Sequence, residues 1–365
     1  MTETLSTVSE IAIYVVMGLY VVAFVLFVLD LAKRSSQGAA PAAVRSAVER
    51  RAEAASASGS AGAVGAARAA GGSTSATLAR PTAVAGAGAG AGGAGGAGAG
   101  AGAGAGDGAT ARASKMLRAA MAVTTVAWII HLLADVTRGV AASRVPWANM
   151  WEFSLTGTLV IVGIFLLANL RWDIRWIGTF ILGLVCVLLM IAQVRYYVPV
   201  SPLPPALQSY WLVVHIMVAI LGTAFFALGF ALAAAQLAQS WRERREKLSL
   251  PESLPFLKTL PNALTLENLS YRVNIVGFIF WTFTLIAGAI WAEKAWGRYW
   301  GWDTKEVWTF IVWVIYAGYI HARATRGWRG SRSAWLAIIG FAAVMFNFGV
   351  VNVFFHGLHS YSGLS

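Results

Sequence analysis

The sequence has 365 residues, of which 58% are hydrophobic and only 12% are charged. Soluble domains carry about 25% charged residues, so this composition excludes a soluble domain and indicates an integral membrane protein. The net charge of +12 would favour a nucleic-acid partner in a soluble chain. In a membrane protein, excess Lys and Arg instead report which loops face the cytoplasm, and we expect no nucleic-acid partner.

The single cysteine, Cys186, lies inside an apolar run. It cannot form an intramolecular disulfide, and the sequence contains no CxxC redox pair. Cys186 is interpreted as a small buried hydrophobic residue. If the protein's function involves thiols, another protein must handle them.

Residues 11–32 form an apolar run that is long enough to cross a bilayer. Acids and no base precede this run, and Lys33 and Arg34 follow it, so we expect residues 1–32 to hold an uncleaved helix whose N-terminus lies outside. Residues 33–115 are rich in Ala, Gly and Ser and contain no aromatic residue. Such a segment buries too little apolar area to offset its ordering entropy, so we predict a disordered linker on the cytoplasmic side.

Seven more apolar runs predict an all-α polytopic bundle of about eight transmembrane helices, seven of them in a domain at residues 116–365. Their predicted ranges are 117–142, 152–170, 174–194, 211–239, 273–292, 306–323 and 334–355. Segments on one side of the membrane hold 22 of the 28 Lys and Arg residues, and segments on the other side hold six. Because cytoplasmic segments collect basic residues, this bias places both chain termini outside the cytoplasm.

One predicted outside loop, residues 291–308, is unusually rich in tryptophan. It reads WAEKAWGRYWGWDTKEVW, with five tryptophans among acids and bases. An aromatic belt at the membrane interface is one interpretation, although Gly297 and Gly301 interrupt the helical spacing of a belt. The other interpretation is an aromatic platform that stacks on a large, flat, apolar ligand, with the charged residues holding anionic substituents.

The five histidines lie at different predicted depths. His215, near the outer start of a span, and His359, in the outside tail, are on the same side as the tryptophan loop. Because haem iron takes axial histidine ligands, the pair predicts a bis-histidine haem site, while hydrogen-bonded interfacial residues are the alternative. His131 and His321 lie within spans, where ionisable groups are costly and usually face the bundle or a cavity. His356 lies at the end of the last span.

The residues WGRYWGWDTKEVW resemble the tryptophan-rich WWD motif of the haem-handling proteins of cytochrome c biogenesis. Over residues 116–365 the chain is similar to the CcsA/ResC family, whose members are often labelled CcsB in actinobacteria. The resemblance implies that the motif contacts haem b in an extracytoplasmic loop. It implies that Trp296, Trp300, Trp302 and Asp303 contribute to this contact.

In that family, one external histidine precedes the motif and another lies in a tail segment similar to GLHSY. His215 and His359 match these positions, which implies that they are the axial ligands of the outer haem iron. His321 matches an intramembrane haem ligand whose second ligand belongs to a partner protein or a fused domain, and His131 is an alternative second ligand. His356 has no clear counterpart and ranks below His359.

The resemblance implies a plasma-membrane protein that exports haem and presents it to apocytochrome c, whose CxxCH thiols then add to the haem vinyl groups. The expected partners are a ResB-type membrane protein and a thioredoxin-like thiol reductant. The chain would be part of a holocytochrome c synthase complex, without acid–base or nucleophilic residues of its own. Glu152 matches an N-x-x-E pattern of the family's early outside loop, which an ordinary helix start explains equally well.

Two other classes of function remain open at this point. A haem-bearing electron-transfer subunit would favour paired histidines at similar depth on facing helices, for which only His131 and His321 qualify. A transporter of another solute would favour internal repeats and charged residues in mid-membrane, and neither is evident.

Overall fold

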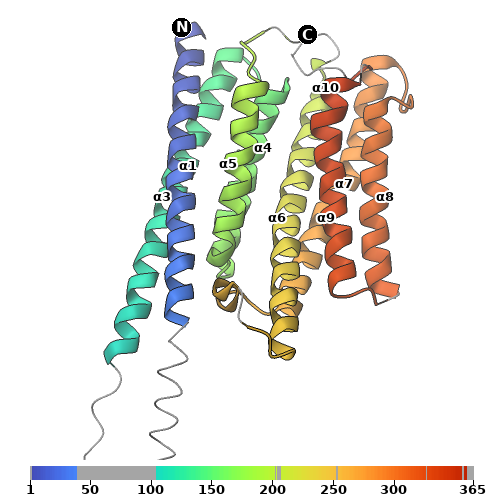
Figure 1. The fold of residues 1–365 in the computed structure, drawn as a ribbon. Coiled ribbons are helices and arrows are strands. Elements are labelled where there is room, and N and C mark those ends of the chain that lie inside the picture. The colour runs from blue at the N-terminus through green and yellow to red at the C-terminus, as the bar shows by residue number, and fades with distance from the viewer. Residues whose placement is uncertain are drawn as a thin grey trace, which may run out of the picture. The chain divides into compact units, whose positions relative to one another are not determined.

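The computed structural model describes residues 2–38, 104–201, 203, 207–251, 254–325, 327–355 and 357–359. Every regular element in this part of the chain is a helix (Figure 1). The long helices are α1 (Thr2–Gly38), α3 (Gly104–Ala142), α4 (Met150–Arg171), α5 (Gly178–Arg195), α6 (Tyr210–Lys247), α7 (Ala263–Trp296), α8 (Thr304–Thr325) and α9 (Ser331–Met345). Short helical segments are Arg175–Ile177, Pro255–Thr259, the π-helix Phe346–Val351 and α10 (Asn352–Phe354).

The predicted class, a polytopic all-α membrane protein, is confirmed. Seven of the described helices are long and apolar enough to cross a membrane. The remaining long helix, α8, has 22 residues, as many as α4. Its tryptophans, tyrosines and charged residues make it less apolar, and it packs against α7 and α9. The predicted linker, residues 33–115, is too long at both ends, because α1 continues to Gly38 and α3 already begins at Gly104. Residues 39–103 lie outside the described residues, so the disorder predicted for them stays a prediction.

At the end of the bundle away from the α7–α8 turn, α6 and α7 also extend well beyond the predicted membrane spans. α6 continues to Lys247, and α7 already begins at Ala263, where the Asn262 side chain accepts a hydrogen bond from the Thr265 N–H. The run of apolar residues that predicts a span ends at the edge of the bilayer. A capped helix can continue into water, because its backbone remains hydrogen-bonded there. The charged last turns of α6 and the first turns of α7 are therefore helical although they are polar.

The tryptophan-rich loop is shorter than predicted. α7 includes Trp291 and continues to Trp296, and α8 begins at Thr304, so only residues 297–303 connect the two helices. Gly297 ends α7 in the left-handed conformation with φ 71°, which glycine adopts without steric cost. The predicted loop at 291–308 is thus corrected to a short turn between two helix ends that themselves carry tryptophans.

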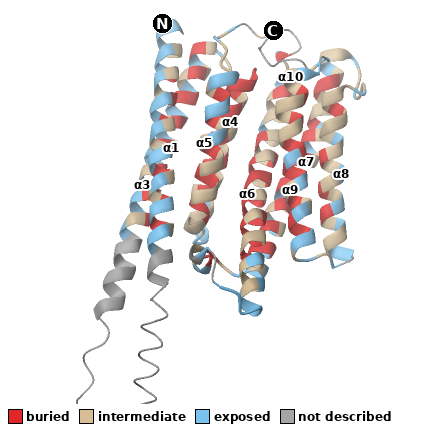
Figure 2. Ribbon diagram, in the orientation of Figure 1, coloured by how far each residue is buried: buried red, intermediate tan, exposed pale blue. Residues whose placement is uncertain are grey.

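The helices bury one face and leave the other apolar and exposed, as lipid-facing helices do. Figure 2 shows buried positions along the inward faces of the helices and exposed positions on their outward faces. Leu167, Leu170 and Val194 are exposed apolar residues of this outer surface. In the core, the rings of Phe226 and Tyr316 stack 3.6 Å apart and join α6 to α8. α1 begins and α10 ends at the same end of the bundle, which also carries the α7–α8 turn (Figure 1).

Candidate functional site

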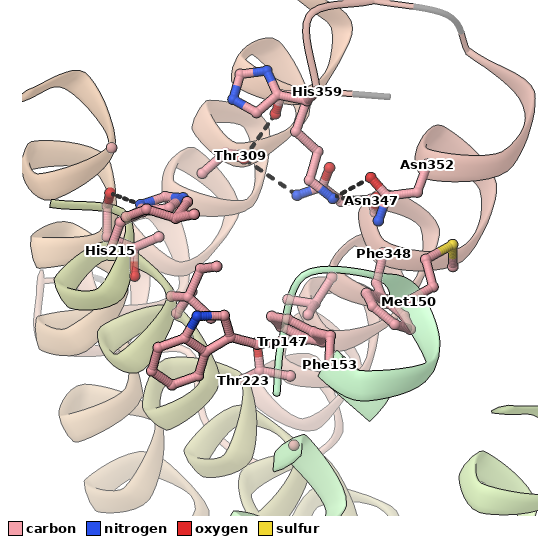
Figure 3. Close-up of a pocket in the computed structure, with 18 of the residues that line it drawn as sticks. Trp147, Met150, Phe153, His215, Thr223, Thr309, Asn347, Phe348, Asn352 and His359 are labelled. Carbon is pink, nitrogen blue, oxygen red and sulfur yellow. Dashed lines mark hydrogen bonds between the residues drawn. The ribbon is translucent and has the colours of Figure 1, made fainter. Parts of the chain in front are cut away.

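A cavity of about 220 Å³ lies between α4, α6, α7, α8 and the π-helix, beside the α7–α8 turn. Its aromatic wall consists of Trp147, Phe153, Trp281, Trp291, Tyr299, Trp300 and Phe348. The polar residues that line it include His215, Lys305, Glu306, Asn347, Asn352 and His359 (Figure 3). Pockets that enclose drug-sized ligands measure about 300–1,000 Å³, so a larger flat ligand would extend beyond this cavity.

His215 lies in the second turn of α6 and is held from two sides. Its Nδ1 is 3.0 Å from the Thr284 carbonyl oxygen, and its ring stacks on Trp291 with centroids 5.8 Å apart. A carbonyl oxygen only accepts, so Nδ1 carries the proton and Nε2 keeps its lone pair. Gly288 lies under the ring, where an added Cβ would come within 2.8 Å of the imidazole. The ring orientation is therefore fixed, and Nε2 remains available to a ligand of the cavity.

His359 is held in the same way by a different acceptor. Its Nδ1 is 2.7 Å from Oδ2 of Asp303, and its ring meets the edges of Trp296 and Trp291. This hydrogen bond holds the pKa of Asp303 below its ordinary value. A Cβ at Gly357 would overlap the Asp303 carboxylate, so this close approach requires glycine. A carboxylate or carbonyl acceptor behind Nδ1 is the usual support of a metal-binding histidine.

The predicted tryptophans have three different environments. Trp300 lines the cavity, whereas Trp296 packs beside it against Trp291 and His359. Trp302 is 77% exposed, has φ 59°, and stands nearly perpendicular to Trp300, with an interplanar angle of 89°. The motif thus forms edge-to-face contacts and not one flat surface. A left-handed conformation in a residue other than glycine costs about 1–3 kcal/mol, so the surrounding turn must hold Trp302 in place.

Glu306 stabilises this turn. One of its carboxylate oxygens, Oε2, accepts hydrogen bonds from the backbone N–H groups of Gly301 (2.8 Å) and Asp303 (3.1 Å). A glutamate in the first turn of a helix that accepts the N–H of the preceding cap residue is a capping interaction. Residues 303–306, the last four of the segment WGWDTKE, are therefore fixed at the start of α8. This sets the position of Asp303 and, through it, that of His359.

Glu152 has a structural explanation. Asn149 caps α4 by accepting the Glu152 N–H, and the buried Glu152 carboxylate pairs with Arg138 and Arg144. Arg138 also donates to the carbonyl oxygen of Val198 at 2.8 Å. Breaking a buried ion pair on one side typically costs about 3–5 kcal/mol. The N-x-x-E pattern thus ties α3, α4 and the loop after α5 together at the end of the bundle where α4 begins.

The remaining histidines do not share the cavity. His321 is exposed on α8. His131 is fully buried on α3, where its Nδ1 is 3.3 Å from the Tyr20 hydroxyl and its Nε2 has no hydrogen-bond partner among the described residues. α3 and α8 lie on opposite sides of the bundle, so the structure does not pair these two histidines on one ligand (Figure 1). His356 lies outside the described residues.

Sequence reasoning missed two polar residues of the cavity wall, Asn347 and Asn352, and gave Lys305 only as one of several charges in the tryptophan-rich loop. Lys305 donates to the carbonyl oxygen of Asn347 (3.0 Å) and to Oδ1 of Asn352 (2.9 Å). Asn347 is buried, lies in the π-helix, and donates to Thr309. The signal was present in the sequence, because Asn347 and Asn352 are polar residues inside an otherwise apolar run. A π-helix displaces backbone carbonyl groups from their α-helical partners, and it is frequent at functional sites.

Residues 147–359 match the family described as Cytochrome C assembly protein. The chain belongs to this family. The match begins at Trp147 and ends at His359, which are also the first and last residues that line the cavity. The cytochrome c assembly region therefore contains the whole cavity and leaves out α1, α3 and the linker.

Curated relatives agree with this assignment. The cytochrome c biogenesis protein CcsA of Prochlorococcus marinus is 41% identical over 179 residues, which cover 44% of this chain and 57% of the relative. CcsA of Heterosigma akashiwo is 33% identical over 249 residues, covering 60% of this chain and 77% of the relative. A solved structure described as cytochrome c haem lyase CcmF aligns with 68% of this chain and 45% of its own, at 20% identity and a TM-score of 0.49. The chain thus spans little more than half the length of the first of these relatives.

Proposed function

We propose that this cytochrome c assembly protein binds haem b in the outer cavity, with His215 and His359 as axial ligands, and presents it for covalent attachment to apocytochrome c. The observation that carries the proposal is that both imidazoles line one cavity with Nδ1 bonded to an acceptor. Their Nε2 atoms are thus left as metal ligands, which is the donor chemistry that haem iron takes from histidine. The aromatic wall supplies stacking area for a porphyrin.

In this proposal, bound haem supplies the reactive vinyl groups, and the chain supplies binding and orientation. Asp303 and the Thr284 carbonyl group hold the two imidazoles, and Trp300 and Trp291 exclude water from the ring faces. The chain contributes no nucleophile to the attachment, and Cys186 lies in the middle of α5, away from the cavity wall. A thioredoxin-like protein would keep the thiols of apocytochrome c reduced, as part of a holocytochrome c synthase complex.

The proposal includes a ResB-type membrane partner. His321 is exposed on α8, so a haem ligated by it would take its second ligand from outside this chain. A lone imidazole on the lipid-facing side of a helix is costly, which favours a partner that covers it. Haem arriving at this inner position would be the cargo that later occupies the outer cavity.

The proposed location is the plasma membrane, with both termini and the cavity on the extracytoplasmic side. The support is the uneven division of Lys and Arg between the two sides and the common end at which α1 begins and α10 ends. Reporter fusions after residues 110 and 255 should be cytoplasmic. An external signal at either site would contradict this orientation.

Haem binding is tested on the purified full chain by its visible absorption spectrum. We expect a Soret band that falls sharply in the variants His215→Ala and His359→Ala. A chain that purifies without haem, and whose Soret band on addition of haemin is the same as that of free haemin, would contradict the proposal and favour a transporter of another solute. Because His131 and His321 lie on opposite sides of the bundle, the structure gives no support to an electron-transfer subunit with an internal histidine pair.

A further inference from the structure

The wall of the outer cavity carries a cation whose hydrogen bonds go only to neutral groups. Nζ of Lys305 donates to the backbone carbonyl oxygen of Asn347 and to Oδ1 of Asn352. In the described part of the chain, no carboxylate lies within ion-pair distance of this ammonium group. Asp303, two residues earlier, is the nearest acid in sequence on that side, but its carboxylate is taken by His359. Burial lowers the pKa of Lys305 to about 7, and two neutral hydrogen bonds leave the third N–H of its ammonium form unused.

Asn352 adds a second donor at the same position. Its Oδ1 accepts the hydrogen bond from Lys305, so the two N–H donors on Nδ2 are directed away from Lys305. Among the described residues, no hydrogen-bond acceptor for Nδ2 is found. Figure 3 shows Asn347 and Asn352 on the same wall, across the cavity from His215. An ammonium and an amide side by side match the two oxygens of a carboxylate, and such charge-assisted hydrogen bonds are about twice as strong as neutral ones.

The other charged group of the wall does not occupy this site. Glu306 directs Oε2 to the backbone of the α7–α8 turn, and its Oε1 has no hydrogen-bond partner among the described residues. It therefore contributes negative charge beside the turn and does not neutralise Lys305 by an ion pair. A ligand carboxylate would be attracted to the side of Lys305 and Asn352 and repelled from the side of Glu306, which gives the cavity an electrostatic direction.

We propose that Lys305 and Asn352 are the binding site for the carboxylate groups of the ligand, which are the propionates if the ligand is haem. This inference rests on the proposed function and adds an orientation to it. The propionates and the vinyl groups lie on opposite halves of the porphyrin. Holding the propionates at the junction of α8 and the π-helix turns the vinyl half away from Lys305, so it is left free for the thiols of the acceptor.

The test compares haemin with haemin dimethyl ester, which has the same ring and iron but no carboxylate. The full chain is placed in lipid nanodiscs, and binding is followed by tryptophan quenching and by the Soret band, with empty nanodiscs as the blank. We expect the wild type to prefer haemin, and Lys305→Gln to lower the affinity for haemin about tenfold while changing that for the ester less than about twofold. Lys305→Arg should keep most of the preference for haemin.

Lys294→Gln is the matched control, because it removes the same charge from an exposed lysine near the same turn that pairs with Glu293. It should change neither affinity. If Lys305→Gln weakens both ligands equally, Lys305 merely joins α8 to the π-helix and the inference is wrong; if it weakens neither, the carboxylates bind elsewhere. If the wild type binds neither ligand better than a His215→Ala/His359→Ala double variant does, the proposed haem site itself fails, and the inference fails with it.

Discussion

The histidines of the outer cavity and those of the membrane interior differ in how they are held. His215 and His359 each have Nδ1 bonded to an acceptor, glycine beside the ring or beside its acceptor, and Nε2 left for the cavity. His131 is buried with only a 3.3 Å contact to Tyr20, and His321 is exposed. In the proposed function, the acceptor behind Nδ1 and the cavity beside the ring mark His215 and His359 as ligands, whereas burial alone does not mark His131.

The largest expected effect is the loss of either outer histidine. His215→Ala or His359→Ala removes an iron bond that aromatic packing cannot replace, so we expect haem affinity to fall by more than about 100-fold, beyond the usual effect of a supporting residue. Exogenous imidazole should enter the vacated position and partly restore binding. Haemin titration with and without imidazole measures both effects.

Leu203→Ala is a matched control, because this residue packs near the outer end but does not line the cavity. It should leave haem affinity unchanged. Normal haem content in both histidine variants would remove the distinction between the outer and the inner histidines.

The next effect tests the acceptor behind His359. Asp303→Asn keeps the size of the side chain but replaces a charged acceptor by a neutral amide, so the imidazole is held less firmly. We expect haem affinity to fall about 10-fold, the lower end of the usual range for such supporting residues. Glu293→Gln removes an exposed carboxylate that pairs with Lys294 and should have no effect. Equal affinities in the two variants would show that the 2.7 Å contact does not position His359.

The fold and the outer site were predictable from the sequence to different degrees. The apolar runs predicted the membrane-spanning helices, because these depend on composition along the chain. The positions of His215 and His359 relative to those runs predicted that the two histidines lie at the same end of the bundle. The cavity wall was not predictable, because Trp147, Thr284 and Asn347 line one cavity only when the loop before α4, α7 and the π-helix pack together. Hydropathy also failed at helix ends, where caps such as Asn262 and Gly297 decide the boundary.

A smaller effect separates two tryptophans of one motif. Trp300 lines the cavity, so Trp300→Ala removes stacking area worth about 1–3 kcal/mol by analogy with base stacking. Trp302 is 77% exposed and outside the cavity wall, so Trp302→Ala should change haem affinity less than about twofold. Haemin titrations of the two variants check this order, and added imidazole should rescue neither. The reverse order would mean that the exposed ring of Trp302 covers the ligand when it binds.

The smallest effects are expected for the inner histidines when the chain is studied alone. His131 has no open side, because its Nε2 is enclosed in the protein, and His321 has no histidine facing it within the described residues. Neither His131→Ala nor His321→Ala should therefore change the haem content of the isolated chain by more than about twofold.

Co-expression with a ResB-type partner should distinguish the two variants. The haem content of the complex should fall for His321→Ala and stay constant for His131→Ala, because only His321 is accessible from outside the bundle. The measurement is haem per polypeptide, by absorbance, for each variant with and without the partner. A parallel loss in both variants of the isolated chain would show that the two histidines act together in one site, and would contradict the separation of α3 from α8.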